Sequence, residues 1–315
     1  MRSKTHVVLS ACAVALAVSL TGCVHARPVS QARGGRAAPA ALSAGAAALI
    51  TMSGSYYADE QALNTAESVL THKCMVAHGF RYQIPAASDP QGQDEEWRPD
   101  LAARRVYGYG LRPGSSPPQA ERAADTYVRS LPPARQARYH RILFGDTARQ
   151  SAIVLPGGQE FTFATQGCIA ESRTRIYGSA AAAMRIFYLP QDFFIMLYPK
   201  AVRSASYRPT LAAWSTCMSQ HGYHYSSPDV ARQQVAAGYR TLAPQAAQRH
   251  EIAVAVQDGM CADKVRMTAI FTSLLGHYAQ QMPTAYRRQL NGVAAAREAA
   301  IQRTKQVITA QPGLG

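Results

Sequence analysis

Apolar residues recur at helical spacing along most of the chain. Leu63, Ala66 and Leu70 lie three or four residues apart and predict a helix that leads into Cys74. The same spacing predicts further helices over residues 119–130, 134–144, 169–187, 211–218, 265–278 and 284–309. Two short apolar runs flank Gly157-Gly158 and predict a β-hairpin. We therefore expect a mainly α fold with one small β-hairpin.

A duplicated segment organises these helices. Residues 74–82 and 217–225 share Cys, Met, His, Gly and a final Tyr, with an aromatic residue after the glycine. Gly79 and Gly222 suit the left-handed position that ends a helix. Each copy is expected to be a capped helix that carries one half-cystine.

The second cysteine of each half repeats as well. An arginine lies five residues and a proline 22 residues after both Cys168 and Cys261. We expect each of these cysteines to open a longer helix, with the proline marking where the next helix starts. The expected organisation is a first half over residues 56–205, carrying an insertion at 86–150, and a second half over 206–312.

The N-terminus has the three parts of a secretory signal. Basic residues precede an apolar stretch of fourteen residues, Val7 to Leu20, which is too short to span a bilayer comfortably. The following Leu20-Thr21-Gly22-Cys23 resembles the bacterial lipobox, in which the cysteine is lipidated. We expect residues 1–22 to be a signal peptide, Cys23 to be lipidated and residues 23–55 to be a flexible tether. The alternatives are a secreted protein cut nearby and an uncleaved anchor.

Cysteine usage fits an oxidising compartment. Of the six cysteines, four remain once Cys12 leaves with the signal and Cys23 carries lipid. Four cysteines allow three pairings, and the duplication favours Cys74–Cys168 and Cys217–Cys261.

Catalytic and metal-binding motifs are weak. Cys-x-x-x-His occurs at Cys74/His78 and Cys217/His221, but disulfides are the more common use of such cysteines outside the cytoplasm. We expect no metal and no cofactor. Thr165-Gln-Gly-Cys168 resembles the nucleophile motif of L,D-transpeptidases, although its arginine is replaced by Ala170 and the upstream His-Gly is missing. A wall-modifying enzyme that uses Cys168 is therefore the alternative hypothesis.

Charge points to the kind of partner. The chain has 33 basic and 19 acidic residues, a formal net charge of +14, and 28 of the basic residues are arginine. Arginine binds phosphate and carboxylate through a bidentate fork. We expect a non-catalytic binding module that contacts the membrane through its lipid and contacts an anionic wall polymer or envelope protein, but no nucleic acid. Biased codon usage is the alternative source of the arginines. Because the insertion distinguishes the halves, Trp97, Tyr107 and Tyr109 are the candidate binding residues.

Several segments together resemble a known group. These are the lipobox, Gly167-Cys-Ile-Ala-Glu171 with Ile176-Tyr-Gly178, Trp214-x-x-Cys-Met-x-x-His-Gly-Tyr223, and Glu251-x-Ala-Val-Ala-Val-Gln-Asp258. Between about residues 60 and 285 the chain resembles uncharacterised exported lipoproteins of Streptomyces and related actinobacteria. The resemblance implies a lipid-anchored protein on the extracytoplasmic face of the cell membrane and leaves its activity open.

Overall fold

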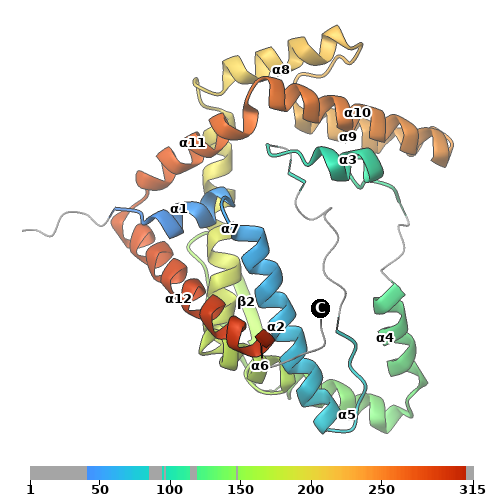
Figure 1. Ribbon diagram of the computed structural model, residues 1–315, viewed down its shortest axis with the longest axis vertical. Helices are drawn as coiled ribbons and strands as arrows, with labels where there is room; N and C mark the ends of the chain where they lie inside the picture. The colour runs from blue at the N-terminus through green and yellow to red at the C-terminus, as the bar shows by residue number, and fades with distance from the viewer. Residues whose placement is uncertain (1–40, 85–93, 96, 114–118, 147, 310–315) are drawn as a thin grey trace, which may run out of the picture. The chain divides into compact units, whose positions relative to one another are not determined.

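Helices make up most of the chain. The structure is a computed structural model that describes residues 41–84, 94–95, 97–113, 119–146 and 148–309. Its elements are drawn in Figure 1. In chain order they are α1 (Ala44–Thr51), α2 (Tyr56–Ala77), α3 (Leu101–Tyr107), α4 (Gln119–Ser130), α5 (Pro133–Phe144), β1 (Gln150–Val154), β2 (Glu160–Ala164), α6 (Cys168–Tyr177), α7 (Ala180–Val202), α8 (Arg208–Gln220), α9 (Pro228–Gly238), α10 (Pro244–Lys264), α11 (Met267–Gln280) and α12 (Thr284–Thr309). The expected fold class, mainly α with one hairpin, is confirmed.

The duplicated segment forms the same helix end twice. Gly79 has a φ of 80° and Gly222 a φ of 83°, so both occupy the left-handed region that the sequence pattern requires. The backbone N–H groups of Phe80 and Tyr223 each donate, over 3.0 Å, to the carbonyl of the methionine five residues earlier. This six-to-one hydrogen bond is the mark of a Schellman motif. The predicted glycine caps are confirmed at α2 and α8.

A side chain in each copy then fixes the extended exit. The His72 imidazole Nδ1 lies 2.5 Å from the carbonyl oxygen of Tyr82. The Ser215 hydroxyl donates to the carbonyl of Tyr225 over 2.7 Å. Both side chains come two residues before the cysteine and both carbonyls eight residues after it. The duplication therefore extends to hydrogen bonds that the shared letters did not reveal.

The four cysteines pair within the halves. Cys74 bonds Cys168 across 94 residues, and Cys217 bonds Cys261 across 44 residues, with Cα–Cα distances of 5.6 and 5.7 Å. The predicted connectivity is confirmed. Cross-links of these lengths remove about 4–5 kcal/mol of chain entropy each from the unfolded state.

The second cysteines do not occupy equivalent places. Cys168 opens α6 as expected, but Cys261 lies in the last turn of α10, and α11 begins at Met267. The expectation that both open a helix is therefore wrong for the second half. The reason is that α10 starts early, at Pro244, where proline fits the first turn of a helix.

The helix expected over 169–187 is interrupted. It ends at Gly178, which has a φ of 87°, and α7 begins after Ser179, whose hydroxyl accepts a hydrogen bond from the Ala182 N–H over 3.0 Å. Gly178-Ser179 is a glycine cap followed by a serine N-cap, a strong signal for two helices. Pro190 lies inside α7 and marks no helix start, whereas the matching Pro283 directly precedes α12.

The tether expected over residues 23–55 includes helix α1 (Ala44–Thr51), so its predicted C-terminal bound is wrong. Ser43 caps α1 by accepting from the Ala46 N–H over 3.1 Å. Leu49 and Ile50 of α1 are buried, and α1 packs against α7, α11 and α12. The alanines that suggested a linker are also the best helix formers, and the two apolar residues give them a face to bury. Residues 44–51 of the stretch 23–55 are therefore a packed helix and not part of a tether.

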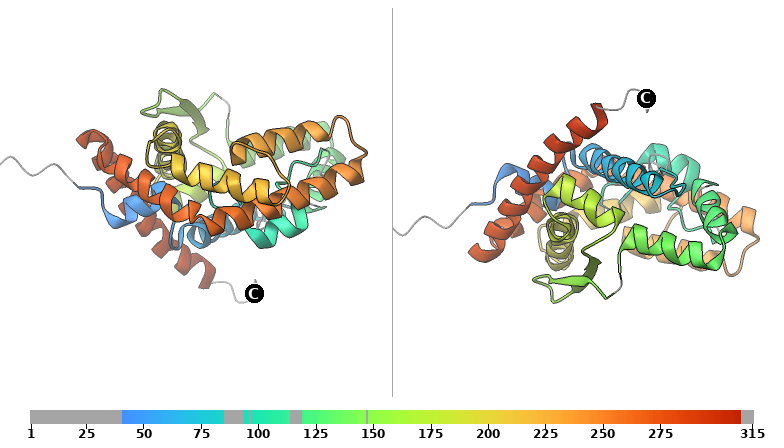
Figure 2. Two further views of the ribbon diagram at one scale, coloured as in Figure 1. Left: turned by 90° about the horizontal axis from the view of Figure 1, so that it is seen from above. Right: turned by 90° about the horizontal axis from the view of Figure 1, so that it is seen from below.

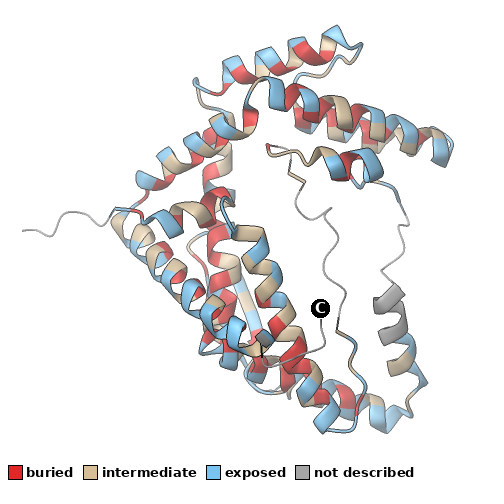
Figure 3. Cartoon of the chain, viewed as in Figure 1, coloured by how far each residue is buried: buried red, intermediate tan, exposed pale blue. Residues whose placement is uncertain are grey.

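Helix α7 lies at the centre of the main core. It packs against α1, α6, α11, α12 and both strands of the hairpin, and Figure 3 shows its buried face. By length and composition α7 is the one helix among the described residues that could cross a membrane. Its buried Phe193 and the Asp192 carboxylate, which accepts from the Gly157 N–H over 2.9 Å, place it in the protein core instead. Residues 39–315 form one unit that includes both halves.

The hairpin packs on α7, and the helices of the insertion pack on helices of both halves. Strands β1 and β2 pair antiparallel from Gln150↔Ala164 to Val154↔Glu160, as expected. The insertion divides, because α3 packs on α10 of the second half while α4 and α5 stay with the first half (Figure 2). α5 contacts α2 and α6 beside the first disulfide.

Candidate functional site

Two of the three candidate aromatic residues are part of the core. Trp97 is 2% exposed and stacks on Phe271 at a centroid distance of 5.1 Å. Tyr109 is 9% exposed and donates its hydroxyl to the Asp258 carboxylate over 2.9 Å. Only Tyr107 is exposed. The expectation that Trp97 and Tyr109 line a binding surface is therefore wrong. Each side chain is buried against a residue distant in sequence, Phe271 for Trp97 and Asp258 for Tyr109.

Asp258 on α10 holds a buried polar network together. Its Oδ2 atom accepts from Arg104 over 2.8 Å and from Tyr109 over 2.9 Å, and its Oδ1 atom accepts from the Trp214 indole N–H over 2.8 Å. The side chains of Arg104 and Asp258 are both 0% exposed. A buried carboxylate with three donors is satisfied on both oxygens.

Asp94 extends this network to the surface. Its two oxygens accept from Arg104 over 2.6 Å and from Arg232 over 2.8 Å. Burial lowers the pKa of Arg104, but Asp258 and Asp94 raise it by more, so the guanidinium stays charged. The charges compensate one another, and we assign the network to structure. It fixes the start of the insertion to α8, α9 and α10.

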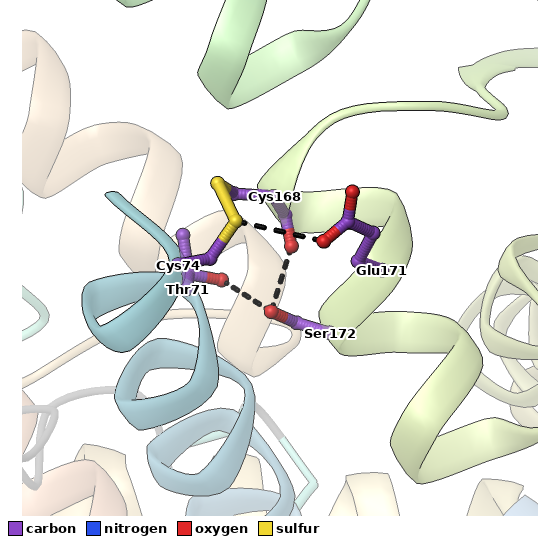
Figure 4. The surroundings of a disulfide bond; sticks show 5 residues. All are labelled: Thr71, Cys74, Cys168, Glu171 and Ser172. Atoms are coloured by element: carbon purple, nitrogen blue, oxygen red, sulfur yellow. Dashed lines mark hydrogen bonds between the residues drawn. A yellow bond between two sulfur atoms is a disulfide. The ribbon is translucent and has the colours of Figure 1, made fainter. Parts of the chain in front are cut away.

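Cys168 has no free thiol in this structure. It is 1% exposed and bonded to Cys74, with the Glu171 carboxylate Oε2 lying 3.6 Å from the Cys74 sulfur (Figure 4). Thr71 and Ser172 hydrogen-bond to each other beneath the disulfide over 3.0 Å. A transpeptidase-like nucleophile requires a thiolate, which a disulfide sulfur is not. The disulfide form therefore lacks the group on which the enzyme alternative depends.

A cavity of about 300 Å³ lies between α1, the start of α2 and α12. Its most buried charged residue is Arg297, which donates to the Tyr56 carbonyl over 2.8 Å and lies over the Tyr56 ring at 4.8 Å. Asp59 at the cavity accepts from the Ser55 hydroxyl over 2.6 Å. Arg297 joins α12 to the start of α2, and Asp59 is bonded within the start of α2, which is the pattern of a structural junction.

An arginine-rich surface lies on α5, the helix that packs beside the first disulfide. Arg135, Arg138 and Arg141 of α5 are exposed, and among the described residues none of the three has an ion-pair partner. We call these three residues the α5 arginine surface. The Arg135 guanidinium lies over the Phe80 ring at 5.5 Å, which holds it close to the helix. Arg138 and Arg141 project from the outer face.

The inner face of α5 explains why this surface is fixed. Tyr139 and Leu143 are buried in a second core, separate from the main one, together with Met75, Phe80 and Cys168. The rings of Phe80 and Tyr139 meet edge to face at 5.4 Å. The disulfide belongs to this second core, so it joins α2 and α6 directly beneath α5.

Two arginines on neighbouring helices, in contrast, have acidic partners. On α4, Arg129 pairs with Asp125 over 3.2 Å. Arg173 on α6 pairs with Glu67 over 2.9 Å. The α5 arginines were overlooked in the sequence, although residues 126–145 contain four arginines and no acidic residue. That run, on a helix whose apolar face was already predicted, is the signal that would have found them.

The fold and this surface define a helical, disulfide-linked protein with three exposed arginines on one helix. Comparison with protein-family models, with curated proteins and with solved structures finds no match.

Proposed function

We propose that this chain is a lipid-anchored protein of the extracytoplasmic face of the cell membrane that binds an anionic polymer of the cell envelope through the α5 arginine surface. The observation that carries the proposal is the set of three exposed arginines on α5, none of which has an acidic partner in the part of the chain that the structure describes. Guanidinium groups bind phosphate and carboxylate oxygens in pairs, and both groups occur in wall polymers.

The location is supported by chemistry at two places in the chain. The signal-like N-terminus and Cys23 lie outside the described residues, so the anchor rests on the lipobox sequence. Two disulfides within one chain are typical of proteins that fold in an oxidising compartment. In such a compartment an anionic polymer is an accessible partner and nucleic acid is not.

A salt-dependent pull-down tests the binding. The protein is incubated with purified cell wall at low and high ionic strength, and exposed charge contacts should weaken steeply as salt screens them. The test variant is the double substitution Arg138→Glu and Arg141→Glu, which leaves the buried face of α5 untouched. An arginine beside an anionic surface contributes about 1 kcal/mol, so losing two contacts should weaken binding roughly 30-fold.

A matched control separates this surface from net charge. Arg203→Glu with Arg208→Glu changes the net charge by the same amount at two exposed arginines outside α5. We expect the control to bind nearly as well as the wild type. Equal losses in both variants would show non-specific attraction, and no wall binding at low salt would refute the proposal. These point variants are preferable to deleting residues 86–150, which would also remove Arg104 and its buried network.

A further inference from the structure

Three potential metal ligands meet at the first disulfide, and a fourth lies beside the Cys74 sulfur. The ligand atoms of Cys74, His78 and Cys168 all lie within 4.8 Å of one another. Glu171 adds a carboxylate, whose Oε2 atom is 3.6 Å from the Cys74 sulfur (Figure 4). Two sulfurs, an imidazole and a carboxylate are all ligands that zinc accepts, and four of them complete a tetrahedral site.

Two helix ends supply these groups in pairs. Cys74 lies in the last turn of α2, and His78, four residues later, caps that helix. Cys168 is the first residue of α6, and Glu171 follows three residues later. Residues three or four apart lie on the same side of a helix, so each end presents two ligands toward the other. The positive end of α6 also favours a thiolate at Cys168.

The second half carries the same disulfide without this chemistry. Lys264 stands where the first half has Glu171, three residues after the second cysteine. Cys261 lies at the C-terminal end of α10, where the helix disfavours a thiolate. Among the described residues, only the set in the first half forms a group that could hold a metal ion. The copies therefore differ in the features that zinc binding needs.

Access to the two disulfides differs as well. Cys74 is half-buried, whereas Cys217 is 5% and Cys261 0% exposed. Thiol–disulfide exchange requires a thiolate to reach one sulfur in line with the bond. A small dithiol should therefore reduce Cys74–Cys168 before Cys217–Cys261.

We propose that the first disulfide is a redox-controlled zinc site. A dithiol reduces Cys74–Cys168, is itself oxidised to a disulfide, and leaves two thiols on the protein. One zinc ion then binds both sulfurs, His78 and Glu171, and the two thiol protons leave to solvent. In the reverse step a small-molecule disulfide accepts two electrons and two protons and becomes a dithiol, while the two sulfurs re-form Cys74–Cys168 and the zinc ion returns to solvent. This proposal does not depend on anion binding by α5.

Cobalt(II) is the probe for this site, because its thiolate charge-transfer and tetrahedral d–d bands report the ligands directly. The full chain in detergent is reduced with dithiothreitol, freed of reductant by gel filtration under argon, and titrated with cobalt and then with competing zinc. We expect one ion per reduced chain, with charge-transfer bands from two thiolates, and no binding to the oxidised chain. Calorimetry in buffers of different ionisation enthalpy should show release of about two protons.

The two exposed ligands provide variants that do not disturb the core. His78→Ala and Glu171→Lys should each weaken metal binding at least roughly tenfold, the second by giving the first half the lysine of the second half. His221→Ala is the matched control at the other disulfide and should bind as the wild type does. Circular dichroism records whether the reduced chain stays folded.

The outcomes are decisive. A reduced chain that binds no cobalt overturns the proposal whether it remains folded or unfolds. Binding that is unchanged in both His78→Ala and Glu171→Lys overturns it too, as does binding that is lost in His221→Ala. Two ions per chain would show that any reduced cysteine pair suffices, which also contradicts the assignment.

Discussion

Replacing Asp258 with alanine should destabilise the protein more than any surface substitution. The change removes a carboxylate that is 0% exposed and accepts three hydrogen bonds, from Arg104, Tyr109 and Trp214. The Tyr109 hydroxyl and the Trp214 indole N–H are then buried without acceptors. Arg104 keeps Asp94 but loses half of its charge compensation.

The magnitude follows from these orphaned groups. Each buried donor left unpaired costs about 1–3 kcal/mol. Removing one partner of a buried ion pair costs about 3–5 kcal/mol in total, because the other charge stays in the interior. We therefore expect Asp258→Ala to lower the free energy of unfolding by about 3–5 kcal/mol.

Tryptophan fluorescence during urea unfolding measures this directly. The chain has two tryptophans, Trp97 and Trp214; both are buried, and Trp214 bonds Asp258 directly. Asp125→Ala is the control, since its side chain is 70% exposed and its pair with Arg129 should be worth less than about 0.5 kcal/mol. A loss below about 1 kcal/mol in Asp258→Ala would refute the assignment of this network as the anchor of the insertion.

Four further results are expected. Tyr177→Phe should raise the free energy of unfolding by about 1 kcal/mol in urea titrations, because the buried Tyr177 hydroxyl has no hydrogen-bond partner among the described residues. Burial, with Asp258 beside Tyr109 and Glu67 beside Tyr177, raises the pKa of both tyrosines above 10. Ionisation of these tyrosines therefore leaves the free energy of unfolding unchanged below pH 10 and lowers it by about 1.4 kcal/mol per pH unit for each tyrosine above it, so their tyrosinate absorbance should appear only with unfolding. Substituting Cys217 and Cys261 together by serine should lower the free energy of unfolding by about 4 kcal/mol, which is measured as a lower urea midpoint. Cys23→Ala should release the protein to the medium or leave the uncut precursor, and mass spectrometry of wild-type protein without acyl groups would contradict the lipobox interpretation.

Local signals made much of the fold predictable. The glycine caps at Gly79 and Gly222, the helix over 284–309 and the hairpin around Gly157-Gly158 depend on residues within a few positions of one another. The disulfide pairing needed one long-range argument, and the duplication supplied it. In each case a repeated pattern or a turn residue determines the structure without knowledge of the tertiary partner.

The predictions for Tyr109 and Trp97 were wrong because a residue distant in sequence determines whether each side chain is buried. Tyr109 has the exposed-loop context of a binding residue, but its hydroxyl is bonded to Asp258, 149 residues away. Trp97 likewise stacks on Phe271. No periodicity near either residue could reveal those partners. The α5 arginines are a different case, because the run of cations that marks them lies within residues 126–145 and needs no distant partner to be recognised.

Duplication also explains why the proposed metal ligands and the α5 arginine surface both lie in the first copy. The two copies keep the parts that hold a helix end in place: the cysteine, the glycine cap and the bond from the side chain two residues before the cysteine to the exit strand. They differ at Glu171 and Lys264, at the helix position of the second cysteine and in the insertion that carries α5. A position that both copies need for folding cannot change freely, whereas one copy can gain ligands or charges at its surface while the scaffold stays intact. The unneutralised arginines and the four metal-ligand groups both lie on the first copy, around one disulfide, which is where a rigid support with a free outer surface is available.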